Sequence, residues 1–179
     1  MSAALHLANS DDMDRLLPLV DACRQEGMTP PAAKSAADGG AVAVAGNAAV
    51  KISPRVQAAE AAEAEARHEA LLELLGGTPL GVIYLIGPRR SPIGYIALSF
   101  GHSIARGGII GSVEEFYLRR ALRGRGIGTE VLGNLLRALS SHGLRALRVE
   151  TEADAPGAGL FRRLGFREAA GQRVLTRAL

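Results

Sequence analysis

The chain has 179 residues, of which 47% are hydrophobic and 22% are charged, and its formal net charge is +3. These are ordinary values for one soluble globular domain that is long enough to bury a core, so we expect a single domain over residues 1–179. The arginines are dispersed and aromatic residues make up only 4% of the chain, which argues against a nucleic-acid partner.

The N-terminal region is expected to contain a short strand over Ala4–Leu7 and then a helix. Ser10 would cap this helix, aspartates follow in its first turn, and Gln25-Glu-Gly27 would end it. Cys23 is the only cysteine, which excludes a disulfide framework and favours the reducing cytoplasm. No signal peptide precedes this region, and a cytoplasmic location is therefore expected.

Residues 29–55 are an atypical segment, rich in alanine, glycine and proline and poor in large side chains. Its part Ala41–Ile52 alternates weakly, and both a small hairpin and a mobile loop remain open for it. The next stretch, Val56–Leu75, is rich in alanine, glutamate and leucine and stops at two glycines, which predicts a helix.

The rest of the chain predicts a β-meander followed by alternating helices and strands. The longest apolar stretch, near residues 81–86, is far too short to cross a bilayer, which takes about 20 residues, so no membrane partner is expected. The expected elements are strands over Gly81–Gly87, Pro92–Phe100 and Ile109–Leu118 with a turn at Gly101–Gly108, a helix over about 126–142, a strand over Leu147–Glu152, a short helix over Ala155–Leu164, and strands over Phe166–Ala169 and Arg173–Arg177.

The most informative segment is Arg123-Gly-Arg-Gly-Ile-Gly128, which lies between a predicted strand and a predicted helix. Glycines let the backbone approach a bound group closely, and the first amides of a helix lack intrahelical partners. The helix dipole and two arginines add positive charge at the same place. This combination predicts a site for a phosphate or pyrophosphate.

Spacing separates three classes of ligand for such a loop. A P-loop requires a lysine in the motif, and the only lysines are Lys34 and Lys51. A dinucleotide fingerprint requires a third glycine where Thr129 stands, although Glu150 lies where a ribose-binding acid would. Too few residues follow the loop for the βα units of that fold. The third pattern, Arg/Gln-x-x-Gly-x-Gly/Ala, is met by this chain.

Arg123, Gly126 and Gly128 supply that pattern, and here the chain resembles the GNAT superfamily of N-acetyltransferases, whose central motif binds the pyrophosphate of coenzyme A. Val113–Arg119 is similar to the acidic and aromatic fourth strand of that family, and Leu147–Glu152 to its fifth. The resemblance implies an α/β (α+β) fold, a single domain with a mixed, mostly antiparallel sheet of six or seven strands, flanking helices, and strands 4 and 5 splayed apart.

The resemblance also implies acetyl-CoA as co-substrate, no metal, and direct transfer of the acetyl group to a primary amine of a small molecule or peptide. It allows a homodimer. Glu114 and Glu115 are adjacent, so a regular strand would point them to opposite sides. We expect Glu114 to be the general base and Glu115 to contact the amine. The cofactor-binding residues implied are Phe116, Tyr117, Leu118, Arg123, Gly124, Arg125, Gly126, Ile127, Gly128, Asp154 and Phe161.

Asp154–Phe166 is similar to the final motif of the family, Asn-x-x-Ala-x-x-Leu-Tyr-x-x-x-Gly-Phe, with two departures. Asp154 replaces the usual asparagine, and Phe161 stands where many members have a tyrosine that protonates the leaving sulfur. Water or Tyr117 could substitute for that acid, and both remain open. The departure at Phe161 and the atypical segment also support an alternative, a non-catalytic acyl-CoA-binding sensor or interaction module.

Overall fold

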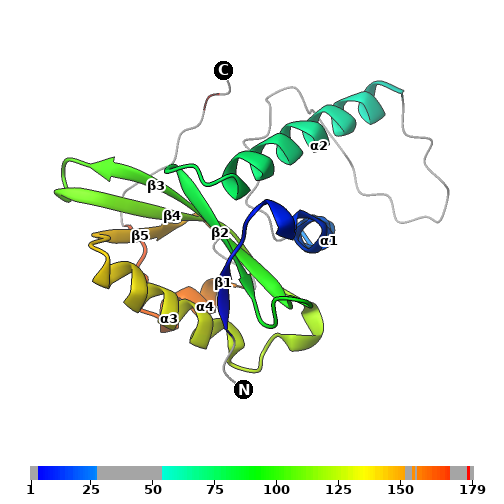
Figure 1. Cartoon of the computed structure of the whole chain (residues 1–179). Helices are drawn as coiled ribbons and strands as arrows, with labels where there is room; N and C mark the ends of the chain where they lie inside the picture. Colours follow the sequence, from blue (N-terminus) through cyan, green and yellow to red (C-terminus); the bar gives the residue numbers. More distant parts are fainter. Residues whose placement is uncertain (1–3, 28–53, 152–154, 156, 170–176, 178–179) are drawn as a thin grey trace.

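The computed structural model describes residues 4–27, 54–151, 155, 157–169 and 177. These residues form one sheet with helices on both faces (Figure 1). The elements in chain order are β1 (Leu5–Leu7), a 3₁₀ turn (Ser10–Asp12), α1 (Met13–Gln25), α2 (Pro54–Leu75), β2 (Gly81–Ile86), β3 (Gly94–Ser103), β4 (Gly108–Leu118), a second 3₁₀ turn (Arg120–Leu122), α3 (Ile127–Ser141), β5 (Ala146–Val149) and α4 (Ala158–Arg163).

The strands lie in the sheet in sequence order, β1-β2-β3-β4-β5. The first four pair antiparallel with their neighbours, whereas β4 and β5 are parallel because α3 connects them. The expected mixed, mostly antiparallel sheet with flanking helices is therefore confirmed. The sheet has five strands within the described residues, compared with the six or seven expected.

One expected strand in the last part of the described chain is not formed. Phe166–Ala169 is not a strand, because Gly165 turns the chain with a φ of 87° and the Phe166 amide donates to the Phe161 carbonyl at 3.1 Å. Phe166 therefore closes the end of α4. Of the expected strand Arg173–Arg177, only Arg177 lies within the described residues, and the stretch Ala41–Ile52 lies outside them.

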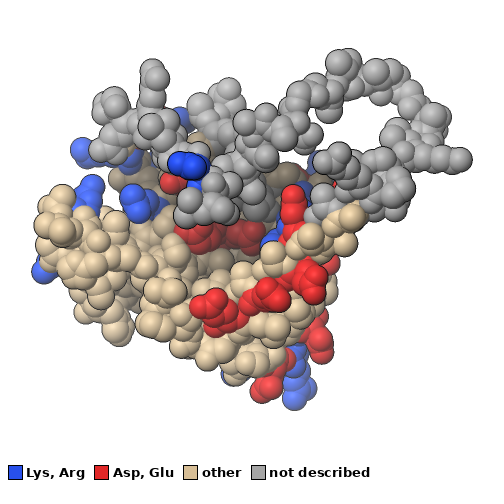
Figure 2. All heavy atoms as spheres, turned by 90° about the horizontal axis from the view of Figure 1, so that it is seen from above, with Lys and Arg blue, Asp and Glu red and all other residues tan. Residues whose placement is uncertain are grey.

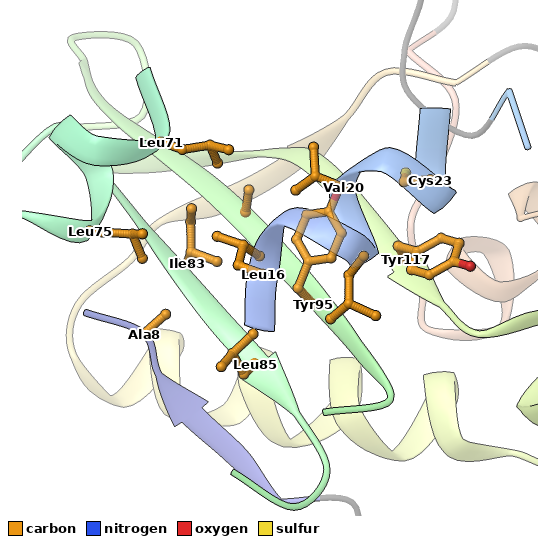
Figure 3. Close-up of a cluster of buried hydrophobic side chains, with 12 residues drawn as sticks. Ala8, Leu16, Val20, Cys23, Leu71, Leu75, Ile83, Leu85, Tyr95 and Tyr117 are labelled. Carbon is orange, nitrogen blue, oxygen red and sulfur yellow. The ribbon is translucent and has the colours of Figure 1, made fainter. Parts of the chain in front are cut away.

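Each face of the sheet carries its own core. In Figure 1, α1 and α2 lie above the sheet and α3 and α4 lie below it. We call the two sides the α1 face and the α3 face. The core on the α1 face combines a helical stripe from α1 with strand residues (Figure 3). It contains Leu16, Leu19, Val20, Cys23, Ile83, Leu85 and Tyr95. The core on the α3 face contains Ile96, Leu98, Val113, Leu132, Leu135 and Phe161.

The start of the first helical segment differs from the expectation. Asn9, and not Ser10, is the capping residue, because its side chain accepts the Asp11 amide at 3.1 Å. Asp12 completes a capping box by accepting the Asn9 amide at 3.2 Å. Asp12 is buried, and Arg15 pairs with it at 2.6 Å, so its charge is compensated.

The hairpin between β3 and β4 is longer than predicted. The expected turn over Gly101–Gly108 is wrong in its first part, since β3 continues to Ser103 and pairs with the start of β4. This extension makes β4 the longest strand of the sheet within the described residues. β4 leads directly into the region of the glycine loop, so its geometry positions the candidate site.

Candidate functional site

The two ends of β4 have different neighbours. β5 pairs with β4 only from Ile110 to Val113. Beyond that point β4 continues to Leu118, paired with β3 on one edge and with no strand on the other edge within the described residues. This divergence of β4 and β5 is the expected splay, and it leaves main-chain groups of β4 available to a ligand.

A β-bulge lies where the two strands part. Leu98 of β3 is paired with Val113, and its neighbour Ala97 is paired with Glu115, so Glu114 is an extra residue in β4. The packing confirms that the bulge shifts, by one residue, which side chains of β4 point to each face of the sheet. Val113 and Phe116 are three residues apart, yet both pack into the core on the α3 face.

The bulge brings the two carboxylates to the same side of the sheet. The Tyr95 hydroxyl donates to Glu115 Oε2 at 2.6 Å, and the Ser99 hydroxyl donates to Glu114 Oε1 at 2.5 Å. Tyr95 and Ser99 are four residues apart in a regular strand, so both face α1. The expectation that Glu114 and Glu115 point to opposite sides is therefore wrong, because it assumed a strand without an inserted residue.

The two carboxylates differ in their surroundings. Glu115 is half-buried, whereas Glu114 is exposed. Burial raises the pKa of Glu115, and the charge of Glu114 adds to this, while the Tyr95 hydrogen bond and the charge of Arg24 oppose it. Glu115 thus takes up a proton more readily than an ordinary glutamate does.

The glycine loop presents a run of free amides. Gly124 and Gly126 have φ values of 74° and 79°, a region that other residues rarely adopt. Gly126 is the N-cap of α3, and the first amide after it with a backbone acceptor is that of Glu130, which donates to the Gly126 carbonyl at 3.0 Å. Within the described part of the chain, no acceptor is recorded for the amides of residues 124–129. Such a run is an anion-binding concavity at a helix N-terminus.

The third glycine of the motif has a packing role. A Cβ at Gly128 would lie 3.2 Å from the Leu160 side chain and 3.5 Å from those of Leu118 and Phe116. The absence of a side chain therefore lets α3 approach both β4 and α4. Ile127 packs beside it against Leu118 and anchors the start of α3.

The first arginine of the loop is already engaged by the protein. Arg123 Nε donates to the Leu118 carbonyl at 2.8 Å, and its Nη2 lies 2.6 Å from Glu26 Oε2. Its guanidinium also lies 5.3 Å from the centre of the Tyr117 ring. Arg125 is exposed and has no side-chain partner within the described residues, so it is the cation of the loop that is free to meet a ligand.

The aromatic residues of the predicted site pack against one another. Phe161 is buried, and its ring meets those of Phe116 and Phe166 edge-on, with centroids 6.5 and 5.3 Å apart. Tyr117 is buried on the α1 face, and its hydroxyl points away from the labelled core residues in Figure 3. Asp154 lies outside the described residues.

Three residues of this arrangement escaped the sequence analysis: Tyr95, Ser99 and Glu26. Tyr95 and Ser99 are placed by strand pairing with β4, which local sequence does not reveal. Glu26 did carry a signal, because a carboxylate at the C-terminal end of a helix opposes the helix dipole and calls for a cationic partner elsewhere.

The described residues contain neither a cluster of metal-ligating side chains nor a helix that could cross a membrane. Across the described ranges, no three side chains of the metal-ligating types come together in a way that could hold an ion. None of the helices in those ranges has the length and apolar character needed to span a bilayer.

The comparisons with known proteins agree with the geometry. Residues 53–166 match the family model described as the acetyltransferase (GNAT) family. The structure is similar to the integron cassette protein HFX_CASS3 from the mobile metagenome of Cole Harbour Salt Marsh, at 29% identity over 98% of this chain and 90% of that chain, with a TM-score of 0.62. A search of curated proteins found no match to this chain.

Two further structures share the fold at lower identity. A possible acetyltransferase from Clostridium difficile 630 is 13% identical over 100% of this chain and 99% of that chain, with a TM-score of 0.67. A predicted acetyltransferase with acetyl-CoA from Clostridium acetobutylicum is 14% identical over 97% and 96%, with a TM-score of 0.57. Because the family model covers well over half of the sequence, the chain belongs to the GNAT family of acetyltransferases and is an acyltransferase of the N-acetyltransferase type.

Proposed function

We propose that this protein transfers the acetyl group of acetyl-CoA directly to a primary amine, with a glutamate of β4 as general base. The observation that carries the proposal is the arrangement along a single strand. The bulge at Glu114 places two carboxylates at one end of the exposed edge of β4, and the loop with free amides follows the other end.

The loop supports coenzyme A as the ligand. The amides of residues 124–129 and the side chain of Arg125 would hold the diphosphate, since both provide positive partial or full charge without a competing partner within the described residues. The open edge of β4 from Phe116 to Leu118 would offer main-chain hydrogen bonds to the pantetheine arm, apart from the Leu118 carbonyl, which accepts from Arg123. The Clostridium acetobutylicum protein of the same fold contains acetyl-CoA.

The surroundings of the two carboxylates favour exchanging the roles expected from sequence. Glu115, half-buried and with a raised pKa, suits the general base, and the exposed Glu114 suits contact with the incoming amine. As the amine nitrogen bonds to the acetyl carbon, Glu115 accepts a proton from that nitrogen and the carbon–sulfur bond breaks. Coenzyme A leaves as a thiolate, which is tolerable because a thiol has a pKa of about 8.5.

No acid from the final motif is needed for this route. Phe161 has no proton to give and packs against other rings. The Tyr117 hydroxyl is the donor in a hydrogen bond to Glu26 at 2.9 Å on the α1 face, so it is committed elsewhere. We propose that the thiolate takes its proton from water after it leaves.

The charge of the α1 face supports a cationic acceptor. Figure 2, which views the molecule from the side of α2, shows acidic side chains gathered on this face. The exposed acidic side chains of α2 are Glu60, Glu63, Glu65, Glu69 and Glu73. With Glu114 and Glu115 on the same face, they would attract an amine in its protonated form, which would give up that proton to solvent before its nitrogen attacks.

The experiment is an assay of thiol release from acetyl-CoA over a panel of small-molecule and peptide amines, combined with calorimetry of coenzyme A. We expect release that depends on an amine. Binding of coenzyme A without such release would favour the non-catalytic module, and no binding at all would contradict the proposed function.

A pair of glycine variants tests the loop within the same experiment. Gly126→Val forces a branched residue into left-handed geometry at the N-cap, and we expect it to weaken coenzyme A at least about tenfold. Gly143→Val is the matched control, because Gly143 has a φ of 85°, equally open space, and a position at the far end of α3. Equal loss of affinity in both variants would contradict a direct role for the loop.

A further inference from the structure

Glu26 has no role in the function proposed above, yet its carboxylate contacts two residues beside the glycine loop, Tyr117 and Arg123. It is the C-cap residue of α1, directly before Gly27, whose φ is 65°. The carbonyl end of a helix repels negative charge, so this position is unfavourable for a glutamate that has no compensating contacts.

Both oxygens of Glu26 are in contact with groups of the site. Oε1 accepts the hydroxyl hydrogen of Tyr117 at 2.9 Å, and Oε2 forms the 2.6 Å ion pair with Arg123. These two contacts hold the pKa of Glu26 below its usual range, with Arg123 as the larger cause. Glu26 therefore keeps its negative charge to a lower pH than an ordinary glutamate does.

Arg123 transmits this contact to the loop. Its guanidinium bonds the Leu118 carbonyl, the last residue of β4, and lies over the Tyr117 ring, while its backbone begins the glycine loop. The next residues have little to fix them, since a Cβ at Gly124 or Gly126 would meet no atom within 4 Å. The loop is thus held by Arg123 at its start and by Ile127 at its end.

We propose that Glu26 is a positioning residue for the diphosphate loop, acting through Arg123. By pairing with the guanidinium, it keeps this side chain on the end of β4 and out of the concavity, and so fixes the direction of the loop amides. This inference rests on the proposed function, because it presupposes that the loop binds coenzyme A. It also explains why Arg125, and not Arg123, is the free cation of the loop.

The test compares acetyl-CoA with S-acetylpantetheine, which lacks the diphosphate, as substrates of the wild-type protein and Glu26→Gln. Loss of the ion pair between Glu26 and Arg123 should raise the KM for acetyl-CoA and the Kd for coenzyme A roughly tenfold, with kcat at saturation nearly unchanged. For S-acetylpantetheine, kcat/KM should stay the same. An equal fall with both substrates would mean that Glu26 supports the whole structure, and no change with either would also overturn the inference.

Two controls complete the design. Glu168→Gln removes a surface ion pair of similar length, that with Arg162 at 2.8 Å, and should leave both substrates unaffected. The double variant Glu26→Gln/Arg123→Gln should bind coenzyme A no more weakly than Arg123→Gln alone, because Glu26 acts through Arg123; additive losses would contradict this. Wild-type protein that fails to bind coenzyme A would refute the proposed function itself, which is a separate outcome.

Discussion

Tyr95 and Tyr117 lie opposite each other on β3 and β4, with ring centroids 6.2 Å apart, and each donates its hydroxyl to a carboxylate. The partner of Tyr95 is Glu115, whose pKa is raised by burial. The partner of Tyr117 is Glu26, whose pKa is lowered by Arg123. Two similar tyrosine–glutamate pairs on one face of the sheet thus have carboxylates whose pKa values are shifted in opposite directions.

The difference comes from a cation at one pair and from burial at the other. Arg123 forms a direct ion pair with Glu26 and fixes the negative charge. Glu115 is instead half-buried, and burial is the main cause of its raised pKa. The neighbouring carboxylate of Glu114 adds to this, and Arg24 opposes it without forming an ion pair with Glu115 in the described residues. A tyrosine hydrogen bond alone therefore does not decide whether a glutamate takes up protons or acts as a fixed anchor.

The largest effect should come from removing the proton acceptor of the first pair. We expect Glu115→Gln to lower kcat about 10²–10⁴-fold, the usual contribution of a general base. Glu114→Gln should cost only about tenfold, since it removes one charged contact to the amine. Steady-state thiol release measures both, and a larger loss in Glu114→Gln would restore the roles expected from sequence.

Removing each tyrosine hydroxyl in turn should have different effects at the two tyrosine–glutamate pairs. The Tyr95 hydrogen bond holds the pKa of Glu115 down, so Tyr95→Phe should raise that pKa further and move the acid limb of the pH–kcat profile to higher pH. Tyr117→Phe should leave the profile in place and weaken coenzyme A less than Glu26→Gln does, because the ion pair between Glu26 and Arg123 remains. Each variant should lose about 1 kcal/mol of unfolding free energy. Identical pH profiles in the two variants would refute the distinction.

The smallest effect is a pH dependence of stability with opposite signs. The lowered pKa of Glu26 contributes stability above the ordinary value of 4.5, and this is lost as the pH falls through the folded-state pKa. The Tm difference between wild type and Glu26→Gln should therefore shrink as the pH falls below 4.5. The raised pKa of Glu115 acts the other way, so wild type should lose stability relative to Glu115→Gln as the pH rises above 4.5. Thermal melts across this range measure both slopes, and slopes of equal sign would contradict the assignment.

The sequence was most informative where structure is determined locally. The glycine loop, the helix after it and the long helix α2 depend on glycine stops and on helical periodicity, and these elements were predicted within a few residues. The family match agrees with the resemblance drawn from Arg123, Gly126 and Gly128. The capping residue is Asn9, where Ser10 was expected, so the predicted helix start differs from the observed one by a single residue.

What sequence could not supply depends on contacts between distant segments. The bulge exists because Ala97 and Leu98 pair with residues that are not adjacent in β4, and no feature of the local residues signals this. Glu26 and Arg123 are almost a hundred positions apart, so their ion pair follows from the way α1 packs on the sheet. Phe166 could have continued as a strand by composition, but its amide closes α4 instead.

The extra residue in β4 has a consequence for how such a site can arise in evolution. If Glu114 were absent, β4 would be a regular strand in which Val113 and Phe116 lie on the same face. Both residues lie on that face in the structure, so the extra residue has not changed where they point. A single-codon insertion at this point can therefore add a second acid beside the first and leave the hydrophobic pattern on both flanks intact. The reverse deletion would return a strand with one acid and an unaltered interior.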